Sequence, residues 1–356
     1  MRWSYRIFRV KGISVELHLS FLLFFMLVYM ASGLQAILFF ILVFAVVLAH
    51  ELMHSLTAIL HGIVVQRITL LPIGGLASIE LPDDPMLELK VSIVGPLFNF
   101  VMAAIGIILL AAVHSSYMGL ENVMAGVFSE GFGVDSLSSV LSIIVSLNLV
   151  LGAFNMLPAF PMDGGRVFRS VLALWMDYAR ATRIATSLGQ LIFIVMAIVS
   201  LLTMNFLWAI IAIFLYYSGG NELRYVSLKS LFGDVALRDI AVPGICYVNS
   251  AISWEEFLST VYRRGQNLYL VVDSEGLMRG VLDMNELAGI DMKRAVGETH
   301  GRSYSVMEGG LKAADVLKKL LGRDLVLVVD KGRFIGYMTP ETLANAASYI
   351  SLRRRL

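Results

Sequence analysis

Apolar residues form long, nearly uninterrupted runs over the first 217 positions of the chain. A helix needs about 20 such residues to cross roughly 30 Å of hydrocarbon. Six runs reach or approach that length, and we therefore predict a polytopic α-helical membrane protein with six transmembrane helices. The fifth and sixth runs are joined only by Met204-Asn205, so the pattern also permits one long segment there. The runs are Val15–Ser32, Leu34–Leu60, Leu89–Val113, Leu137–Leu157, Arg183–Thr203 and Phe206–Tyr217.

Charged residues are sparse up to about residue 220 and frequent after it. Residues 1–220 contain 21 of the 55 Asp, Glu, Lys and Arg side chains, and residues 221–356 contain the other 34. The first part has the composition of a bilayer-embedded domain, and the second has that of a soluble globular domain. We place the boundary near Ser218–Asn221, which predicts a membrane domain over 1–220.

The composition of the whole chain excludes several classes of protein. Hydrophobic residues make up 58% of the chain and the mean hydropathy is +0.77. The formal net charge of +1 gives no basic field of the kind that nucleic-acid-binding proteins use, so we predict no nucleic-acid partner. A single cysteine, Cys246, excludes an internal disulfide framework.

Among the loops that join the predicted runs, only alternate ones contain Lys or Arg residues. They occur before the first run and after the second, fourth and sixth runs, whereas the three intervening loops contain none. Because basic loops stay in the cytoplasm, both termini are predicted to be cytoplasmic. The basic residues in these terminal segments and loops are Arg2, Arg6, Arg9, Lys11, Arg67, Arg166, Arg169, Arg180, Arg224 and Lys229.

The second run contains the sequence His50-Glu51-Leu52-Met53-His54. Four residues make about one helical turn, so both imidazoles project from one face and can bind one zinc ion, with Glu51 beside the open position as general base. Ionisable groups within a membrane helix are costly and are usually functional. The alternative is that the histidines hydrogen-bond to neighbouring helices while Glu51 pairs with an arginine.

A catalytic zinc site needs a third protein ligand, and two residues are candidates. His61 lies seven residues after His54, about 10 Å along the helix, which is too far to share the metal. Asp163 follows the fourth run and emerges on the side where His50 and His54 end their helix, so the topology brings all three to one depth. The alternative for Asp163 is an Asp-Gly turn at a helix boundary.

Three motifs together resemble one known family. His50-Glu51-x-x-His54, Ser92-x-x-Gly95-Pro96-x-x-Asn99 and Asn155-x-x-Pro158-x-x-x-x-Asp163-Gly164 are similar to the motifs of the site-2 protease family of intramembrane zinc metalloproteases. The resemblance implies that His50, His54 and Asp163 bind one Zn²⁺, that Glu51 is the catalytic acid and base, and that Asn155 and Asn99 lie near the substrate. The layout resembles the branch typified by bacterial proteases that process sporulation factors.

The segment Val65–Glu80 does not have the pattern of a helix. It is rich in β-branched residues and contains Pro72 and the pair Gly74-Gly75. The family resemblance implies a membrane-associated β element. We hypothesise that its free edge, including Gly74 and Gly75, pairs with an unwound substrate segment, because a protease holds its peptide extended. The alternative is an ordinary cytosolic loop.

The C-terminal part contains an internal repeat. Leu270–Leu282 recurs as Leu327–Met338, and each copy predicts a strand, a turn, a second strand and then a helix opening at Asn285 or Pro340. An amphipathic helix precedes each copy, at Ser253–Arg264 and Leu311–Leu321. This α/β pattern resembles a tandem pair of CBS domains at 221–290 and 291–350, followed by a basic tail at 351–356.

CBS domains commonly bind adenine nucleotides, so the resemblance implies ATP or AMP as a second ligand. The ribose-contacting pattern G-x-x-[ST]-x-x-D of that family is only partly matched. Thr339 fits its Ser/Thr position, Asp283 replaces that residue in the first repeat, and Glu286 is a longer carboxylate than its Asp. The resemblance also implies regulation through the CBS pair and a homodimer formed by it.

Taken together, the sequence predicts an intramembrane zinc metalloendopeptidase that acts by regulated intramembrane proteolysis. Its partners would be the lipid bilayer and a transmembrane protein substrate, such as a membrane-tethered transcription factor, a pro-protein or an anti-sigma factor. The active site is predicted to face the cytoplasmic side. The alternative is a CBS-gated transporter or channel, but the first and last three runs show no repeat of the kind that transporters have.

Overall fold

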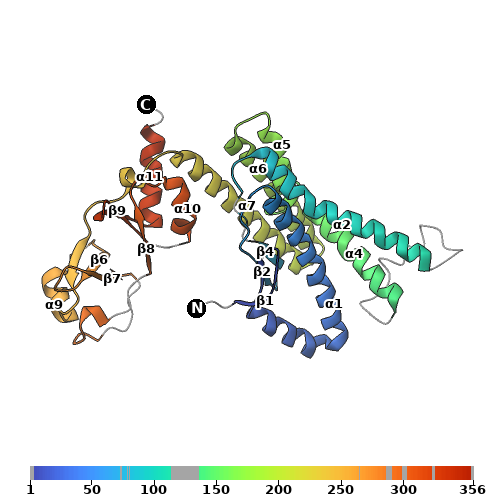
Figure 1. Cartoon of the computed structure of the whole chain (residues 1–356), viewed down its shortest axis with the longest axis horizontal. Helices are drawn as coiled ribbons and strands as arrows, with labels where there is room; N and C mark the ends of the chain where they lie inside the picture. Colours follow the sequence, from blue (N-terminus) through green and yellow to red (C-terminus); the bar gives the residue numbers. More distant parts are fainter. Residues whose placement is uncertain are drawn as a thin grey trace. The chain divides into compact units, whose positions relative to one another are not determined.

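The computed structural model describes residues 4–72, 74–77, 79, 81–113, 136–263, 265–285, 291–298, 303–322 and 325–353. The chain divides into two compact units, Met1–Leu223 and Arg224–Leu356 (Figure 1). Helix α7, Phe206–Phe232, runs without interruption through the expected boundary at residue 220. The predicted loop between the third and fourth runs lies outside the described residues.

Among the described residues, five helices are long and apolar enough to cross a membrane. The predicted polytopic helical architecture is confirmed, and the fifth and sixth runs are separate helices. A short helix, α5 at Asp163–Ala173, lies between two of the long ones. The long helices are α1 Ser20–Leu60, α2 Pro85–Val113, α4 Leu137–Asn155, α6 Tyr178–Leu202 and α7.

Helix α1 folds back on itself at Gly33 (Figure 1). Gly33 has φ 75° and ψ −165°, a combination that interrupts the helix and that glycine adopts readily. The rings of Phe21 and Phe44 lie 4.4 Å apart between centroids, whereas a straight helix would separate them by roughly 35 Å. The segment before Gly33 is only about 20 Å long, less than a full crossing. The count of six spans therefore stays a prediction.

A four-stranded sheet packs beside α1 in the order β1-β2-β3-β4. Strands β2 and β3 are parallel, whereas the other two pairs are antiparallel. The β element predicted over Val65–Glu80 is confirmed by β3 and β4, and its alternative as an ordinary loop is wrong. The strands are β1 Ser4–Val10, β2 Ile13–His18, β3 Arg67–Leu71 and β4 Gly74–Ala77.

The predicted start of the first apolar run, Val15, is wrong. Val15 lies in β2, and the helix begins only at Ser20. The segment Ile13–His18 alternates apolar and polar residues, which is the period of a half-buried strand. Lys11 and Gly12 both have positive φ, 44° and 91°, as the tight turn between β1 and β2 requires.

The C-terminal unit contains two three-stranded sheets with the same design. In each sheet the first strand pairs parallel with the second, and the third pairs antiparallel with the second. The predicted tandem α/β repeat is therefore confirmed. The strands are β5 Cys246–Asn249, β6 Leu268–Val272, β7 Met278–Asp283, β8 Tyr304–Glu308, β9 Leu325–Asp330 and β10 Arg333–Met338.

Helices flank these sheets where the sequence predicts them. The helix expected over Ser253–Arg264 consists of α9, Trp254–Glu256, and a π-helical turn, Phe257–Val261. Asn285 lies in a turn, and the rest of the helix expected to open there lies outside the described residues. The other elements are α8 Leu237–Ile240, a 3₁₀ turn at Val296–Glu298, α10 Ala313–Leu321 and α11 Pro340–Arg353.

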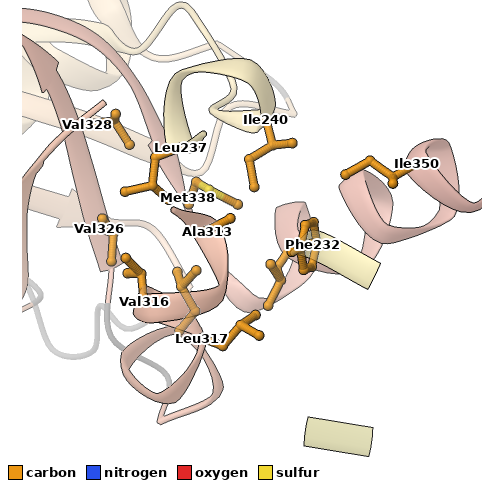
Figure 2. Packing of buried hydrophobic residues seen from close by; sticks show 12 residues of the cluster. Phe232, Leu237, Ile240, Ala313, Val316, Leu317, Val326, Val328, Met338 and Ile350 are labelled. Atoms are coloured by element: carbon orange, nitrogen blue, oxygen red, sulfur yellow. The ribbon is translucent and has the colours of Figure 1, made fainter. Parts of the chain in front are cut away.

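The core of the second repeat includes the end of α7. Phe232, the last residue of α7, is fully buried with Leu317, Val326 and Ile350 (Figure 2). Tyr225 and Leu228, which precede Phe232 on α7, also pack against this cluster. The C-terminal unit is therefore built partly on the helix that leaves the membrane unit.

Candidate metal centre

Three side chains from two helices converge in the membrane unit. His50 and His54 lie one turn apart on α1, and Asp163 is the first residue of α5. The Nε2 atoms of the two histidines lie 3.0 Å apart. Asp163 Oδ2 lies 3.0 Å from His50 Nε2 and 2.9 Å from His54 Nε2. Both histidines are buried, so the structure brings together the three predicted ligands.

Helix α2 orients both imidazole rings. His54 Nδ1 donates to the backbone carbonyl of Val91 at 2.6 Å, and His50 Nδ1 donates to Asn99 Oδ1 at 3.0 Å. Each Nδ1 thus carries the proton, and in the neutral rings each Nε2 presents its lone pair towards Asp163. Hydrogen bonds of this kind fix the tautomer and the ring plane of metal-binding histidines.

The donor set fits a zinc ion. Two nitrogen lone pairs and a carboxylate oxygen meet at 2.9–3.0 Å. A shared proton can bridge only two of these atoms, whereas one metal ion satisfies all three. Tetrahedral ligands at about 2.0–2.1 Å from zinc would lie roughly 3.3 Å apart, close to the observed spacing. Two histidines and a carboxylate are an established ligand set for catalytic zinc.

As a zinc ligand, Asp163 would be an ionised carboxylate. Its place at the N-terminus of α5 also favours a negative charge, because unpaired backbone N–H groups gather there.

Three glycines provide the space into which the two imidazole rings and the start of α5 pack. A Cβ atom at Gly95 of α2 would collide with the rings of both His50 and His54. At Gly164 it would collide with the backbone of Met156 and Leu157, and at Gly165 with that of Ala159 and Phe160. The Gly95 motif thus accommodates the imidazoles, and the Asp-Gly-Gly sequence lets α5 begin directly against the loop that precedes it.

Glu51 lies between the cluster and the sheet. A Cβ atom at Gly75 of β4 would come within 2.7 Å of Glu51 Cγ and 3.4 Å of Val47 Cγ1. Gly74 has φ 138°, a conformation that other residues rarely adopt, and has open space around it. Strand β4 is an edge strand of the four-stranded sheet. Both predicted glycines therefore lie on the strand that contacts the acidic residue of the motif.

The other predicted residues of the membrane unit are not among the three converging side chains. Asn99 is fully buried and hydrogen-bonds His50, so it orients that ring, and its place near the substrate stays a prediction. Asn155, the last residue of α4, donates to Leu151 O of its own helix at 3.1 Å. His61 is exposed just beyond the end of α1 and donates to Thr57 O, as expected for a residue outside the site.

One orienting group was not predicted from the sequence. The carbonyl oxygen of Val91 fixes His54, but every residue has a carbonyl, so no side-chain pattern marks it. The Nδ1 atoms of both histidines hydrogen-bond α2, as the alternative has it, whereas their Nε2 atoms face Asp163 at 2.9–3.0 Å.

The predicted nucleotide residues occupy the ends of β7 and β10. Asp283 Oδ1 accepts a hydrogen bond from the backbone N–H of Asn285 at 3.0 Å. Thr339 Oγ1 accepts from the backbone N–H of Thr342, and so caps the first turn of α11. Glu286 lies outside the described residues. A cavity of about 580 Å³ in this unit lies elsewhere, beside Ile240 and Tyr349.

The fold and the cluster define a membrane-embedded metallohydrolase, and comparison with known proteins specifies it further. Residues 38–202 match peptidase family M50. A zinc metalloprotease of Methanocaldococcus jannaschii is 32% identical, over 100% of this chain and 99% of that protein. A putative zinc metalloprotease of Mycobacterium tuberculosis, Rip3, is 25% identical over 80% of this chain and 73% of its own length. The chain therefore belongs to the site-2 protease family of zinc metalloproteases.

Solved structures are similar to each part of the chain. The site-2 protease from Methanocaldococcus jannaschii is 33% identical, covers 62% of this chain and 95% of its own, and has a TM-score of 0.45. The CBS domain of a bacterial CNNM/CorC family Mg²⁺ transporter is 18% identical, covers 35% of this chain and 82% of its own, and has a TM-score of 0.30.

Proposed function

We propose that this protein hydrolyses a peptide bond within or beside a transmembrane segment of another membrane protein. The observation that carries the proposal is the convergence of His50, His54 and Asp163 on α1 and α5. His50 lies about 17 residues after the Gly33 turn, or roughly 25 Å along an apolar helix, which is less than the hydrocarbon thickness. A site at that depth would meet peptide bonds that soluble proteases do not reach.

Different residues would bind the metal ion and transfer the proton during peptide hydrolysis. His50, His54 and Asp163 would hold Zn²⁺ as the resident cofactor. A bound zinc ion polarises carbonyl groups and makes water acidic enough to act as a nucleophile near neutral pH. Glu51 would accept the proton that water loses on attacking the peptide carbonyl, and would deliver it to the departing amine nitrogen. Hydrolysis consumes one water molecule and leaves a new carboxylate and a new amine.

We propose that β4 holds the substrate. Its outer edge has no partner strand among the described residues, and Gly75 lies directly against Glu51. An extended peptide paired with this edge would pass beside the general base. Asn155 would contact the substrate near the same site. Replacing Gly74 and Gly75 together with valine is expected to reduce cleavage while zinc stays bound, and zinc loss would refute this assignment.

We infer that the membrane domain covers 1–220 and that both termini and the active site face the cytoplasm. The basic loops support this orientation. The natural substrate class is a membrane-tethered protein, such as a transcription factor, a pro-protein or an anti-sigma factor. Cleavage of such a protein near the cytoplasmic side would release its cytoplasmic part.

We propose that the two CBS-like repeats, 221–290 and 291–350, regulate the protease, and that they bind an adenine nucleotide and form a homodimer. Asp283, Glu286 and Thr339 occupy positions that align with the nucleotide-binding pattern, and Thr339 matches its Ser/Thr. Calorimetric titration of the full-length protein in nanodiscs with ATP and with AMP should release or absorb heat. A flat titration with both would end the nucleotide proposal.

The central test is a comparison of wild type with Glu51→Gln, purified and assayed on a membrane protein substrate. Wild type is expected to contain one zinc ion per chain and to cleave. Glu51→Gln is expected to keep the zinc and to lose at least roughly 100-fold in rate, the usual contribution of a general base. A metal-free wild type or an active Glu51→Gln variant would refute the protease proposal.

A further inference from the structure

A buried ionic cluster lies away from the three predicted ligands. Arg169 of α5 is paired with Glu88 of α2, through two nitrogens to the two carboxylate oxygens, and with Glu222 Oε1 of α7 at 2.8 Å. Ser170 and Tyr178 donate to Glu88 Oε2 at 2.9 and 3.1 Å. The side chains of Arg169 and Glu88 are each 3% exposed. This cluster plays no part in the proposed hydrolysis.

Such a cluster is costly unless its geometry is well satisfied, because each buried charge loses its hydration. Here the hydrogen-bonding capacity of Arg169 is well used, because three of its nitrogens donate to carboxylates. Its guanidinium also lies 4.7 and 4.8 Å from the ring centres of Phe160 and Tyr178. An arginine held on every side fixes the orientation of the helix that carries it.

Glu88 and Arg169, the buried pair of this cluster, lie on α2 and α5, the helices that contribute to the proposed metal centre beside α1. Glu88 lies on α2, which supplies Val91 and Asn99 to the two histidines. Arg169 lies on α5 six residues after Asp163, about 9 Å along the helix. The pair therefore fixes the helix that orients the histidines relative to the helix that begins with the carboxylate.

The third partner comes from a helix that continues into the C-terminal unit. Glu222 is 33% exposed at its side chain, far more than Glu88. It precedes Phe232 by ten residues on α7, and Phe232 belongs to the core of the second repeat. A change in that core that rotates or shifts α7 would move Glu222 before it moved Glu88.

We propose that Arg169 is a positioning residue for Asp163, and that Glu222 couples zinc affinity to the C-terminal unit through α7. This rests on the proposed zinc site and deepens the proposed regulation. Loss of Glu222 leaves the Arg169–Glu88 pair intact, so the fold persists while Arg169 of α5 loses one of its two carboxylate partners. The ligand triangle then loosens, because Asp163 is held less firmly against the histidines.

The test measures zinc binding by Glu222→Gln in the full-length protein in nanodiscs, by competition with a chelator and with Zn²⁺ itself as the probe. We expect affinity to fall severalfold, by less than the roughly 10- to 100-fold loss for groups bonded directly to a ligand, because Glu222 acts through Arg169. The melting temperature of the metal-free protein should stay within about 2 °C of wild type. Arg224→Gln removes an exposed charge from the same helix and should change neither quantity.

A second variant tests the route through α7. Inserting three glycines after Leu223 interrupts the helix between Glu222 and the C-terminal core, and should weaken zinc binding by a similar factor. Combining it with Glu222→Gln should cause no further loss, because both changes remove the same coupling. Wild-type zinc affinity in Glu222→Gln would overturn the proposal. So would additive losses of zinc affinity in the double variant. A fall in the melting temperature of metal-free Glu222→Gln that accompanies its loss of zinc affinity would also overturn it, because the effect would then be general destabilisation.

These outcomes are separate from the test of the proposed function. Zinc affinity and the melting of the metal-free protein do not depend on Glu51 or on turnover. A chain that binds zinc normally but fails to cleave would end the protease proposal and leave the role of Glu222 standing. If the wild-type chain cleaves and the Glu222→Gln variant binds zinc as tightly as wild type, the protease proposal stands and the role of Glu222 is refuted.

Discussion

Single side chains outside the proposed ligand set orient the ligands, and Asn99 is the clearest of them. It is fully buried, and its carbonyl oxygen accepts the Nδ1 proton of His50. We expect Asn99→Leu to weaken zinc binding roughly 10- to 100-fold, because His50 then loses the partner that fixes its tautomer and ring plane. Chelator competition on purified protein measures this change.

Asn99→Asp is the matched control, because it keeps an acceptor oxygen at the same place. Zinc affinity in that variant should stay near the wild-type value, since carboxylates commonly orient metal-bound histidines. If Asn99→Leu holds zinc as tightly as wild type, Asn99 does not act through His50.

Individual site residues can be predicted from the sequence only where they lie close together in the chain or belong to a distinctive motif. His50, Glu51 and His54 share one helical turn, so their spacing alone predicts a common face. Asp163 lies 109 residues after His54, and its assignment needed the predicted topology as well as its motif. The contact between Gly75 and Glu51 joins a strand to a helix, and such packing cannot be read from spacing within either segment.

At the scale of elements, β4 is the strand on which the proposed substrate edge lies directly against Glu51. Gly75 faces Glu51 so closely that even one methyl group would displace the carboxylate. Gly75→Ala is therefore expected to lower kcat by about tenfold or more, because Glu51 must lie within hydrogen-bond reach of the proton it takes. Zinc content should remain unchanged, and steady-state kinetics with metal analysis would check both quantities.

Gly95→Ala offers the contrasting result on α2. Its added methyl group would meet His50 and His54 instead of Glu51, so it should lower zinc affinity. Gly75→Ala protein that loses zinc to the same degree would show that β4 supports the ligands and not the general base.

The sequence predicted most elements but missed the first two strands. Long apolar helices were predictable because their length and composition leave few alternatives in a bilayer. Strand β2 was merged with the following helix, since Ile13, Val15 and Leu17 extend the apolar run that begins at Ser20. Its period-two alternation and the Lys11-Gly12 turn were the signals that distinguish it.

At the scale of the whole molecule, the sheet constrains the path of the chain through the bilayer. Strand β2 precedes α1 and strand β3 follows it, yet the two pair side by side from Ser14 to Leu17. The α1 hairpin therefore leaves from and returns to the same sheet, which requires the chain to re-emerge on the side from which it entered. The charge-density step near residue 220 predicted the change in composition, but not that α7 would continue through it.

This path makes the orientation of the protein testable with single cysteines. In a Cys246→Ser background, Lys11→Cys lies in the β1–β2 turn, Asn205→Cys lies between α6 and α7, and Glu275→Cys lies in an exposed turn of the first repeat. The basic loops predict that Lys11 and Glu275 face the cytoplasm and Asn205 the opposite side. An impermeant thiol reagent should label the first two only in inside-out vesicles and Asn205→Cys only in right-side-out vesicles. Labelling of Lys11→Cys and Asn205→Cys from the same side would contradict the predicted topology, because the helices between them would then cross the bilayer an even number of times.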